Sequence, residues 1–182
     1  MTAATVKSTL ITNLETVPLA TSASPKDFYG IERVSCATVE AATTSLDEDN
    51  DRILMVPVPM EARVLGIYLL NDKLDSHSTV AITNDIGLYY GQGCSQTPGT
   101  LIDDDAYAVA ITALQAASTA ATGSYNYAFH TKDIAKVTNH VWEDGSLTSN
   151  PGGTAYIGLS IQTPAATAAG GTITMIVKYV VD

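Results

Sequence analysis

The stretch Thr172-Ile-Thr-Met-Ile-Val-Lys-Tyr-Val-Val181 decides the fold class of this 182-residue chain. Apolar and polar side chains alternate along it: Ile173, Met175, Val177, Tyr179 and Val181 fall on one face, and Thr172, Thr174 and Lys178 fall on the other. Successive side chains of a β-strand point to opposite faces of a sheet, so this alternation has the period of a strand and not of a helix. The pattern therefore predicts a half-buried strand over residues 172–181.

The same alternation recurs upstream, where Ile157, Leu159 and Ile161 lie opposite Ser160 and Gln162. The small residues between the two stretches predict a turn. Further apolar runs of strand length are divided by turn-rich breaks, which is typical of the short strands of a sandwich. These runs cover residues 29–39, 52–58, 63–70, 79–83, 87–90, 125–129 and 156–162.

Two segments interrupt this rhythm and predict helices. The acidic run 103–105 precedes apolar residues at helical spacing, and acids stabilise the N-terminal end of a helix, so we expect a helix over 104–117. Apolar spacing within 133–144 ends at Gly145, which suits a left-handed C-terminal cap and predicts a second, short helix. The expected fold is mainly β, an antiparallel β-sandwich that is jelly-roll-like and carries two short helical insertions.

We expect residues 27–182 to form this sandwich as a single domain and residues 1–26 to form an extended N-terminal arm. The arm is rich in Thr, Ser and Ala, and it has too little apolar surface to fold alone. Its β-prone piece contains Leu10 and Ile11, which we predict bind a partner by adding a strand to the edge of a neighbouring sheet. A disordered tail is the alternative, since chain ends are often loose.

Charge and composition restrict the classes of partner. The formal net charge is −10, and the nine Lys and Arg residues are scattered singly, so no basic patch can neutralise phosphates and we expect no nucleic-acid partner. Charged residues make up only 15% of the chain, against about 25% in typical soluble domains. The surface must therefore be largely polar and uncharged, as is common where proteins meet in an assembly, although a weakly charged secreted domain would have the same composition.

Membrane and redox features are sparse. Residues 1–7 lack the basic start and apolar run of a signal peptide, and no stretch approaches the roughly 18 apolar residues of a membrane helix, so we expect synthesis in the cytoplasm and no membrane partner. Cys36 and Cys94 could pair, but two cysteines in a chain of this length do not make the disulfide framework of small secreted domains. Free, partly buried thiols are the preferred interpretation.

The acidic loop Asp47-Glu-Asp-Asn-Asp51 has carboxylates at alternate positions, as calcium loops do. Arg52 stands where an EF-hand needs Gly, and Val58 stands where it needs Glu, so an EF-hand is excluded. A looser calcium site that joins this loop to residues 103–105 stays open as an alternative, while solvated loop acids are the better interpretation. We predict no metal and no cofactor.

No arrangement of catalytic residues stands out. His77, His130 and His140 lie in different segments, and none has a Cys, Asp or second His at zinc-binding spacing. The sequence has no nucleophile elbow, no phosphate-binding Gly loop and no Cys-x-x-Cys pair. Trp142 is best interpreted as an anchor of the second helix on a sheet, because a Trp buries a large apolar area. We therefore predict that the chain is not an enzyme.

Six phrases of the sequence, taken in order, resemble a family of virion structural proteins of tailed bacteriophages. Each phrase is weak alone, and only their order along nearly the whole chain is specific. The phrases are Lys7-Ser-Thr-Leu-Ile-Thr-Asn13, Pro57-Val-Pro59 leading to Ala62-Arg63-Val64, Asn71-Asp-Lys-Leu-Asp75, Asp85-Ile-Gly-Leu-Tyr89, Val141-Trp-Glu-Asp144 and Val177-Lys-Tyr-Val-Val-Asp182.

This resemblance implies a structural component of the virion, most of all a capsid decoration (cement) protein that binds the outer face of the head and stabilises it. It further implies that the partners are the major capsid protein and other copies of the chain, arranged as a homotrimer that caps exposed sheet edges by closed symmetry. The acidic charge agrees with the capsid exterior, because a protein lining the packaged genome would meet phosphate repulsion.

Two other classes stay open. A fibre, collar or tail component would have the same sandwich, polar surface and arm. A carbohydrate-binding β-sandwich module would need an exposed aromatic platform, for which Tyr89 with Tyr90 and Tyr125 with Tyr127 are the candidates. Packing on one face of a strand is the simpler interpretation of Tyr125 and Tyr127.

Overall fold

The computed structural model of the protein describes residues 31–118, 136 and 138–181. Residues Glu32–Val181 belong to one compact unit. Its elements, with η for a 3-10 helix, are β1 (Ile31–Ala41), η1 (Thr43–Ser45), β2 (Arg52–Pro59), β3 (Ala62–Asn71), β4 (Thr83–Tyr90), β5 (Leu101–Ile111), η2 (Ala113–Gln115), α4 (Val141–Asp144), β6 (Thr154–Thr163) and β7 (Gly171–Val181).

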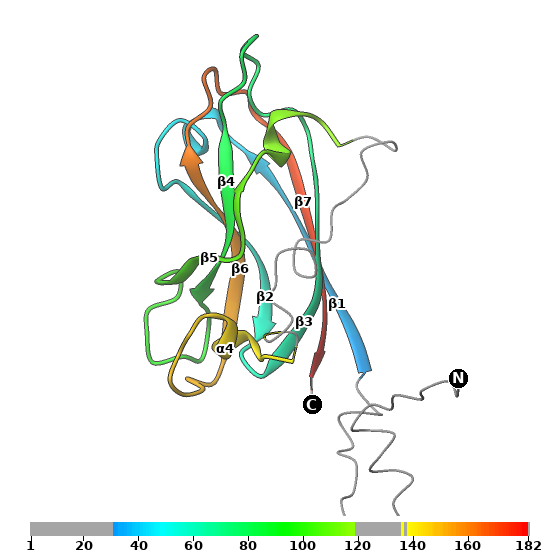
Figure 1. Ribbon diagram of the computed structural model, residues 1–182, viewed down its shortest axis with the longest axis vertical. Helices are drawn as coiled ribbons and strands as arrows, with labels where there is room; N and C mark the ends of the chain where they lie inside the picture. The colour runs from blue at the N-terminus through cyan, green and yellow to red at the C-terminus, as the bar shows by residue number, and fades with distance from the viewer. Residues whose placement is uncertain (1–30, 119–135, 137, 182) are drawn as a thin grey trace, which may run out of the picture. The chain divides into compact units, whose positions relative to one another are not determined.

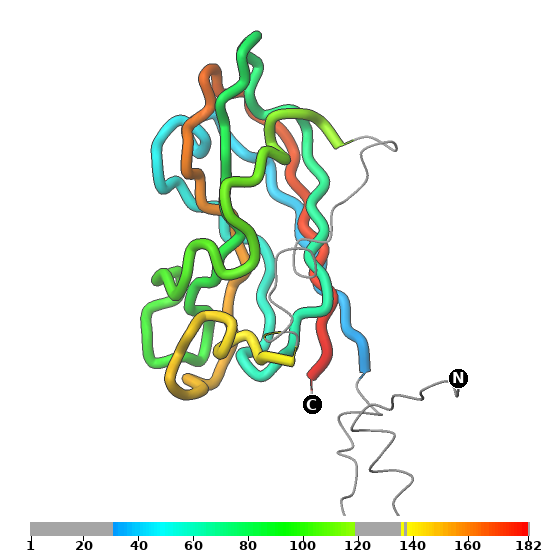
Figure 2. Tube along the Cα trace, in the orientation of Figure 1, coloured from blue at the N-terminus to red at the C-terminus, as the bar shows by residue number. Residues whose placement is uncertain are grey.

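The strands form two antiparallel sheets (Figure 1). One sheet has three described strands in the order β1-β7-β3, and the other has four in the order β2-β6-β4-β5. The chain changes sheet at each step from β1 to β4 and again between β6 and β7, whereas β4, β5 and β6 stay in the four-stranded sheet, and such crossings between two layers are typical of a jelly roll. The path of these crossings can be followed in Figure 2. The predicted mainly β sandwich is confirmed.

The core lies between the two sheets. The stretch 172–181 forms most of β7, and its inward residues Ile173, Met175 and Val177 are buried as predicted. The inward residues of β6 meet them from the other sheet and are equally buried: Ile157, Leu159 and Ile161. Each such side chain contributes roughly 1.5–3 kcal/mol by leaving water. The period-two pattern in the sequence therefore marks the side chains whose burial between the sheets stabilises the fold.

The predicted helix over 104–117 is wrong. Leu101–Ile111 form β5, an edge strand of the four-stranded sheet, and within the predicted range only Ala113–Gln115 are helical, as η2. Hydrogen bonding to β4 outweighs the helix propensity of this alanine-rich segment, because tertiary context regularly overrides weak local preferences.

A bulge explains why the strand period is missing from β5. Asp103 pairs with Leu88, whereas Ala108 pairs with Ile86, so β5 advances five residues while β4 advances two. Extra residues of this kind disrupt the regular ladder and bend the strand. The acidic run 103–105 lies at the start of this bulge.

The second predicted helix is reduced to α4, Val141–Asp144, and part of the predicted range 133–144 lies outside the described residues. The predicted left-handed cap at Gly145 is wrong, since its φ is −78° and the positive φ of 56° belongs to Ser146. Glycine suits position 145 for another reason, because a Cβ there would lie 2.6 Å from Cγ2 of Ile102. None of the helices in the described ranges has the length and apolar character needed to cross a membrane.

The remaining predicted strands have mixed outcomes. β4 runs without a break over Thr83–Tyr90, so the prediction of a strand over 79–83 is wrong for residues 79–82, which form an irregular loop. The predicted strand over 125–129 and the arm with Leu10 and Ile11 lie outside the described residues.

Candidate functional site

The histidines that the structure describes serve local structure. Nδ1 of His77 lies 2.8 Å from the carbonyl oxygen of Thr79 and accepts the Thr79 N–H at 3.0 Å, which closes a tight turn. Nδ1 of His140 lies 3.0 Å from Oε2 of Glu143. These contacts have the character of turn and cap interactions, and His130 lies outside the described residues.

Trp142 anchors α4 on the sandwich, as predicted. Its side chain is partly buried against the core, and its backbone N–H donates to the carbonyl oxygen of Met60 at 3.3 Å. The ring of His140 stacks over the Trp142 ring with 6.4 Å between the centroids. Both rings are therefore used for packing.

The carboxylate of Asp75 is fully buried and ties two loops together. It accepts five backbone N–H groups, from His77 (3.1 Å) and Thr167 (3.1 Å) at Oδ1 and from Ala81 (2.7 Å), Ile82 (3.3 Å) and Ala166 (3.0 Å) at Oδ2. Burial alone would raise the pKa of Asp75, but the hydrogen bonds hold that pKa well below its ordinary value. The acid at the end of the phrase 71–75 is thus a structural bracket between loops.

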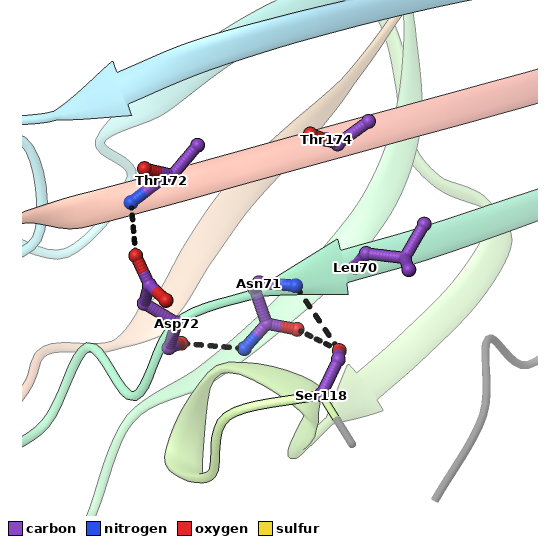
Figure 3. A pocket seen from close by; sticks show the side chains of 6 residues that line it. All are labelled: Leu70, Asn71, Asp72, Ser118, Thr172 and Thr174. Atoms are coloured by element: carbon purple, nitrogen blue, oxygen red, sulfur yellow. Dashed lines mark hydrogen bonds between the residues drawn. The ribbon is translucent and has the colours of Figure 1, made fainter. Parts of the chain in front are cut away.

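Asn71 forms a second bracket at the end of β3, and Figure 3 shows it beside a shallow pocket. Its Nδ2 donates to the carbonyl oxygens of Asp72 (2.7 Å), Ala113 (3.0 Å) and Ala116 (2.9 Å). The Ser118 hydroxyl accepts the Asn71 N–H at 3.0 Å and donates to Oδ1 at 3.3 Å. Sequence reasoning used the phrase 71–75 for resemblance and missed both brackets.

The pocket beside Asn71 is too small for a typical small-molecule site. Its volume is about 220 Å³, against roughly 300–1,000 Å³ for ligand pockets. Leu70, Asn71, Asp72, Ser118, Thr172 and Thr174 line it.

On its outer face, the three-stranded sheet carries exposed apolar side chains beside pairs of polar side chains that bond across neighbouring strands. Val34 of β1 is 58% exposed and Leu70 of β3 is 38% exposed. Cross-strand pairs link β1 to β7: Thr38 with Thr174 (2.9 Å), Glu40 with Thr172 (2.9 Å) and Glu32 with Lys178 (3.4 Å). Within the described residues β1 has a strand partner on one side only, so it presents a free backbone edge of the kind that pairs with other chains.

Residues Asp85–Tyr89 lie in β4, and two of them contact the bulge of β5 and hold it in place. A Cβ on Gly87 would lie 2.5 Å from the carbonyl oxygen of Asp104 and 2.6 Å from that of Asp103, so the bulge needs glycine beneath it. Oδ1 of the buried Asp85 accepts the Ala110 N–H at 2.5 Å. These two contacts give a physical reason for the Asp and Gly of this phrase.

The bulge brings Asp103, Asp104 and Asp105 together, with carboxylate oxygens within 4.8 Å of one another. Burial raises the pKa of Asp103, and the neighbouring Asp105 adds to the effect. Burial also raises the pKa of Asp85, where the charges of Asp104 and Asp105 oppose the hydrogen bond from Ala110. The negative charges of the three acids therefore repel one another, and Asp103 and Asp104 are partly shielded from water.

The loop Asp47–Asp51 does not join this acidic group. Within the described residues, the carboxylates that converge are those of the 103–105 run alone. Oδ2 of Asp51 accepts the Glu48 N–H at 3.1 Å, and residues 47–50 are exposed. The geometry thus gives no support to the calcium site that would combine the two segments, and the loop acids are solvated as expected.

The tyrosine platform is wrong for its first candidate pair. Tyr89 is fully buried, and Tyr90 packs partly buried against the core. Tyr125 and Tyr127 lie outside the described residues.

The two cysteines are free, as preferred from the sequence. Cys36 is exposed on β1, whereas Cys94 is partly buried and donates from Sγ to the carbonyl oxygen of Gly152 at 3.0 Å. The expectation of partial burial therefore holds for Cys94 and is wrong for Cys36.

Comparison with known proteins gives similarity of fold only. No family model matches the chain, and no curated protein matches it. A chain of the cyanophage Pam1 capsid asymmetric unit is similar over 92% of this chain and 97% of that chain, with 20% identity and a TM-score of 0.52. A chain in the capsid of Ralstonia phage GP4 is similar over 82% of this chain and 85% of that chain, with 23% identity and a TM-score of 0.50. At these identities the likeness shows a shared sandwich fold.

Proposed function

We propose that the chain is a non-enzymatic structural component of a tailed-phage capsid, and within the capsid a decoration protein that binds the outer face of the head. The observation that carries this proposal is the fold shared with chains of two phage capsids, one of them matched over 97% of its length. The order of sequence phrases supports the same class independently. Fold similarity alone does not assign function, so the proposal depends on both.

The charge and the described polar groups support an external, non-catalytic role. With a net charge of −10, the chain would be repelled by packaged nucleic acid at the inner face of the shell. The buried carboxylate of Asp75 and the buried amide of Asn71 are occupied by backbone groups, so they hold loops in place. The small pocket beside Asn71 and the edge of β1, which has no second strand partner among the described residues, are surfaces that suit protein partners, which we propose are the major capsid protein and further copies of the chain.

The proposed assembly is a homotrimer, and we expect light scattering of the purified protein at high micromolar concentration to give three times the mass of the 19.1 kDa chain. The physical reason is the long edge strand β1, because closed symmetry can cover such edges in each copy. A strictly monomeric species at these concentrations would contradict the trimer.

The decoration role predicts that the protein stabilises capsid shells. Heads that lack the protein should release their genome at a lower temperature than the same heads after the purified protein is added back, because a ligand that binds only the assembled shell stabilises it by mass action. Fluorescence of a DNA-binding dye during heating measures release. Identical release curves would reject the decoration role, and particles that carry the protein only on their tails would favour a fibre, collar or tail component.

The N-terminal arm supplies a matched variant for this experiment. We propose that Leu10 and Ile11 add a strand to a neighbouring sheet, so deletion of residues 2–20 should weaken co-sedimentation with undecorated heads. Circular dichroism should show an intact sandwich, because the buried core residues of the structure all lie in Glu32–Val181. Attachment as tight as that of the full chain would show that the arm is passive.

A further inference from the structure

The three-stranded sheet ends at β3, whose strand neighbour in the part of the chain that the structure describes is β7. The other sheet has four strands, and sandwiches of the jelly-roll type are built from eight strands in two sheets. An edge strand offers a row of backbone donors and acceptors to an extended segment beside it. The position next to β3 is therefore where a further strand would complete the sandwich.

At one end of β3, the chain that leaves η2 already bonds to this edge. The Ser118 N–H donates to the carbonyl oxygen of Asn71 at 2.7 Å, and the Ser118 hydroxyl accepts the Asn71 N–H at 3.0 Å. The next N–H along the chain, that of Asp72, donates instead to the carbonyl oxygen of Thr172 in β7 at 3.0 Å. Figure 3 shows Ser118 on the side of β3 opposite Thr172. Both backbone groups of Asn71 therefore point away from β7.

The backbone of β3 alternates in the same way before this point. In an antiparallel strand, residues two positions apart direct their N–H and C=O groups to the same side. Leu69 thus shares the direction of Asn71, whereas Leu70, which pairs with Thr174 of β7, shares the direction of Asp72. The edge marked by Ser118 therefore continues along β3 at alternate residues.

At the opposite end of β3, the chain returns through α4. This helix contacts β3, and the Trp142 N–H donates to the carbonyl oxygen of Met60, which lies just before β3 begins. Residues 119–140 must therefore connect the C-terminal end of β3 to its N-terminal end, which is the direction of an antiparallel neighbour. At roughly 3.4 Å per residue, the 10 residues of β3 extend about 34 Å. Residues 119–140 can span this length with residues to spare for turns at both ends.

The sequence of this connection contains a stretch with the period of a strand. Its aromatic residues Tyr125, Tyr127 and Phe129 fall on one face, and the residues between them, Asn126 and Ala128, fall on the other. Aromatic residues are enriched in strands, where one face packs on the core and the other meets water. This stretch is the strand that the sequence predicts over residues 125–129.

We propose that residues 125–129 bind the edge of β3 that lies opposite β7, as an antiparallel strand of the same chain. Tyr125, Tyr127 and Phe129 would face the core, and the three-stranded sheet would gain a fourth strand. The remaining edge of that sheet among the described strands is then β1, which is where a partner could add a strand. Because the proposal rests on contacts within the sandwich, it does not depend on the proposed place of the protein in a capsid.

Nuclear Overhauser effects between backbone protons of the full, unmodified chain test the proposal directly. Opposite residues of antiparallel strands bring their Cα atoms to about 4.5–5.5 Å, so cross-peaks should join residues 125–129 to β3. A mixture of isotope-labelled and unlabelled protein, filtered for contacts between different chains, should not show these cross-peaks. Their absence from the unmodified chain, cross-peaks to a strand other than β3, or cross-peaks that arise between different chains would each overturn the proposal.

Hydrogen exchange at two neighbouring amides of β3 gives a second measurement. The Leu69 N–H points toward the proposed strand and the Leu70 N–H points toward β7, so a loss of the proposed strand should affect Leu69 alone. The double variant Asn126→Pro/Tyr127→Pro removes two successive N–H groups, one of which must face β3 because successive groups point to opposite sides. Exchange at Leu69 should become at least about tenfold faster, while exchange at Leu70 should stay nearly unchanged.

The matched control is Ala120→Pro/Ala121→Pro, which places two prolines in the same connection but before the proposed strand. It should leave exchange at both amides close to that of the unmodified chain. Equal acceleration at Leu69 in the two double variants would overturn the proposal, as would a Leu69 amide that exchanges in the unmodified chain as fast as an exposed one. If exchange at Leu70 accelerates equally, the sandwich itself has opened, and the cross-peaks of the unmodified chain decide.

Discussion

Replacing Asp75 by alanine is expected to lower the free energy of unfolding by about 3–5 kcal/mol. The carboxylate is fully buried and accepts five backbone N–H groups, so its removal leaves these donors without a partner inside the protein. For a chain of this length, such a loss lowers Tm by about 6–20 °C. Urea titration and thermal unfolding followed by circular dichroism measure the two quantities.

Asp72→Ala is the matched control for this variant. Asp72 is exposed, and its Oδ2 accepts one backbone N–H, from Thr172 at 2.9 Å. Its loss should cost about 1 kcal/mol or less, because water can replace an exposed carboxylate. Equal losses in the two variants would contradict the role of Asp75 as a bracket between loops.

The same bracket predicts the sign of a pH effect. The pKa of Asp75 is lower in the folded chain than in the unfolded chain, where an Asp titrates near about 3.9. Its stabilising contribution is therefore fully present above that value and is lost as the pH falls toward the folded pKa. Between roughly pH 4 and pH 2, the unmodified chain should lose more stability than Asp75→Asn, and parallel urea midpoints would show that Asp75 contributes nothing to this loss.

Gly87→Ala should lower the free energy of unfolding by about 2–3 kcal/mol through overpacking. The added Cβ would lie 2.5–2.6 Å from the carbonyl oxygens of Asp104 and Asp103, and backbone atoms cannot turn away as a flexible side chain can. The bulge of β5 must then move off β4. Hydrogen exchange should report this locally, because the Ala110 N–H would lose its bond to Asp85 and exchange faster.

Gly170→Ala is the control for this variant. A Cβ at Gly170 would meet the carbonyl oxygen of Ala41 at 3.2 Å, a tight contact that a small shift relieves. We expect a loss below about 1 kcal/mol. A Gly87 variant that matches this control in stability and in exchange at Ala110 would show that the bulge tolerates displacement.

The sequence was sufficient where one face of a strand lies on the core. Alternation in 172–181 and 156–162 predicted β7 and β6 with their inward residues, because the side-chain period of a strand is a local property and burial of alternate residues is what stabilises the sheet. Free thiols were the preferred interpretation of Cys36 and Cys94 from the number of cysteines and the length of the chain, and both cysteines are free in the structure. Tyr89 with Tyr90 was weighed only as an exposed platform, since nothing local shows that Tyr89 is fully buried.

Only the tertiary structure decided β5 and the sites attached to it. The run 103–105 looks like the start of a helix, but pairing with β4 through a bulge makes it part of a strand and brings its three carboxylates together. Likewise, the five N–H groups on Asp75 come from segments separated by up to 92 residues in the chain. Hydrogen bonds between distant segments depend on how the sheets bring those segments together, and a local pattern of residues carries no information about that arrangement.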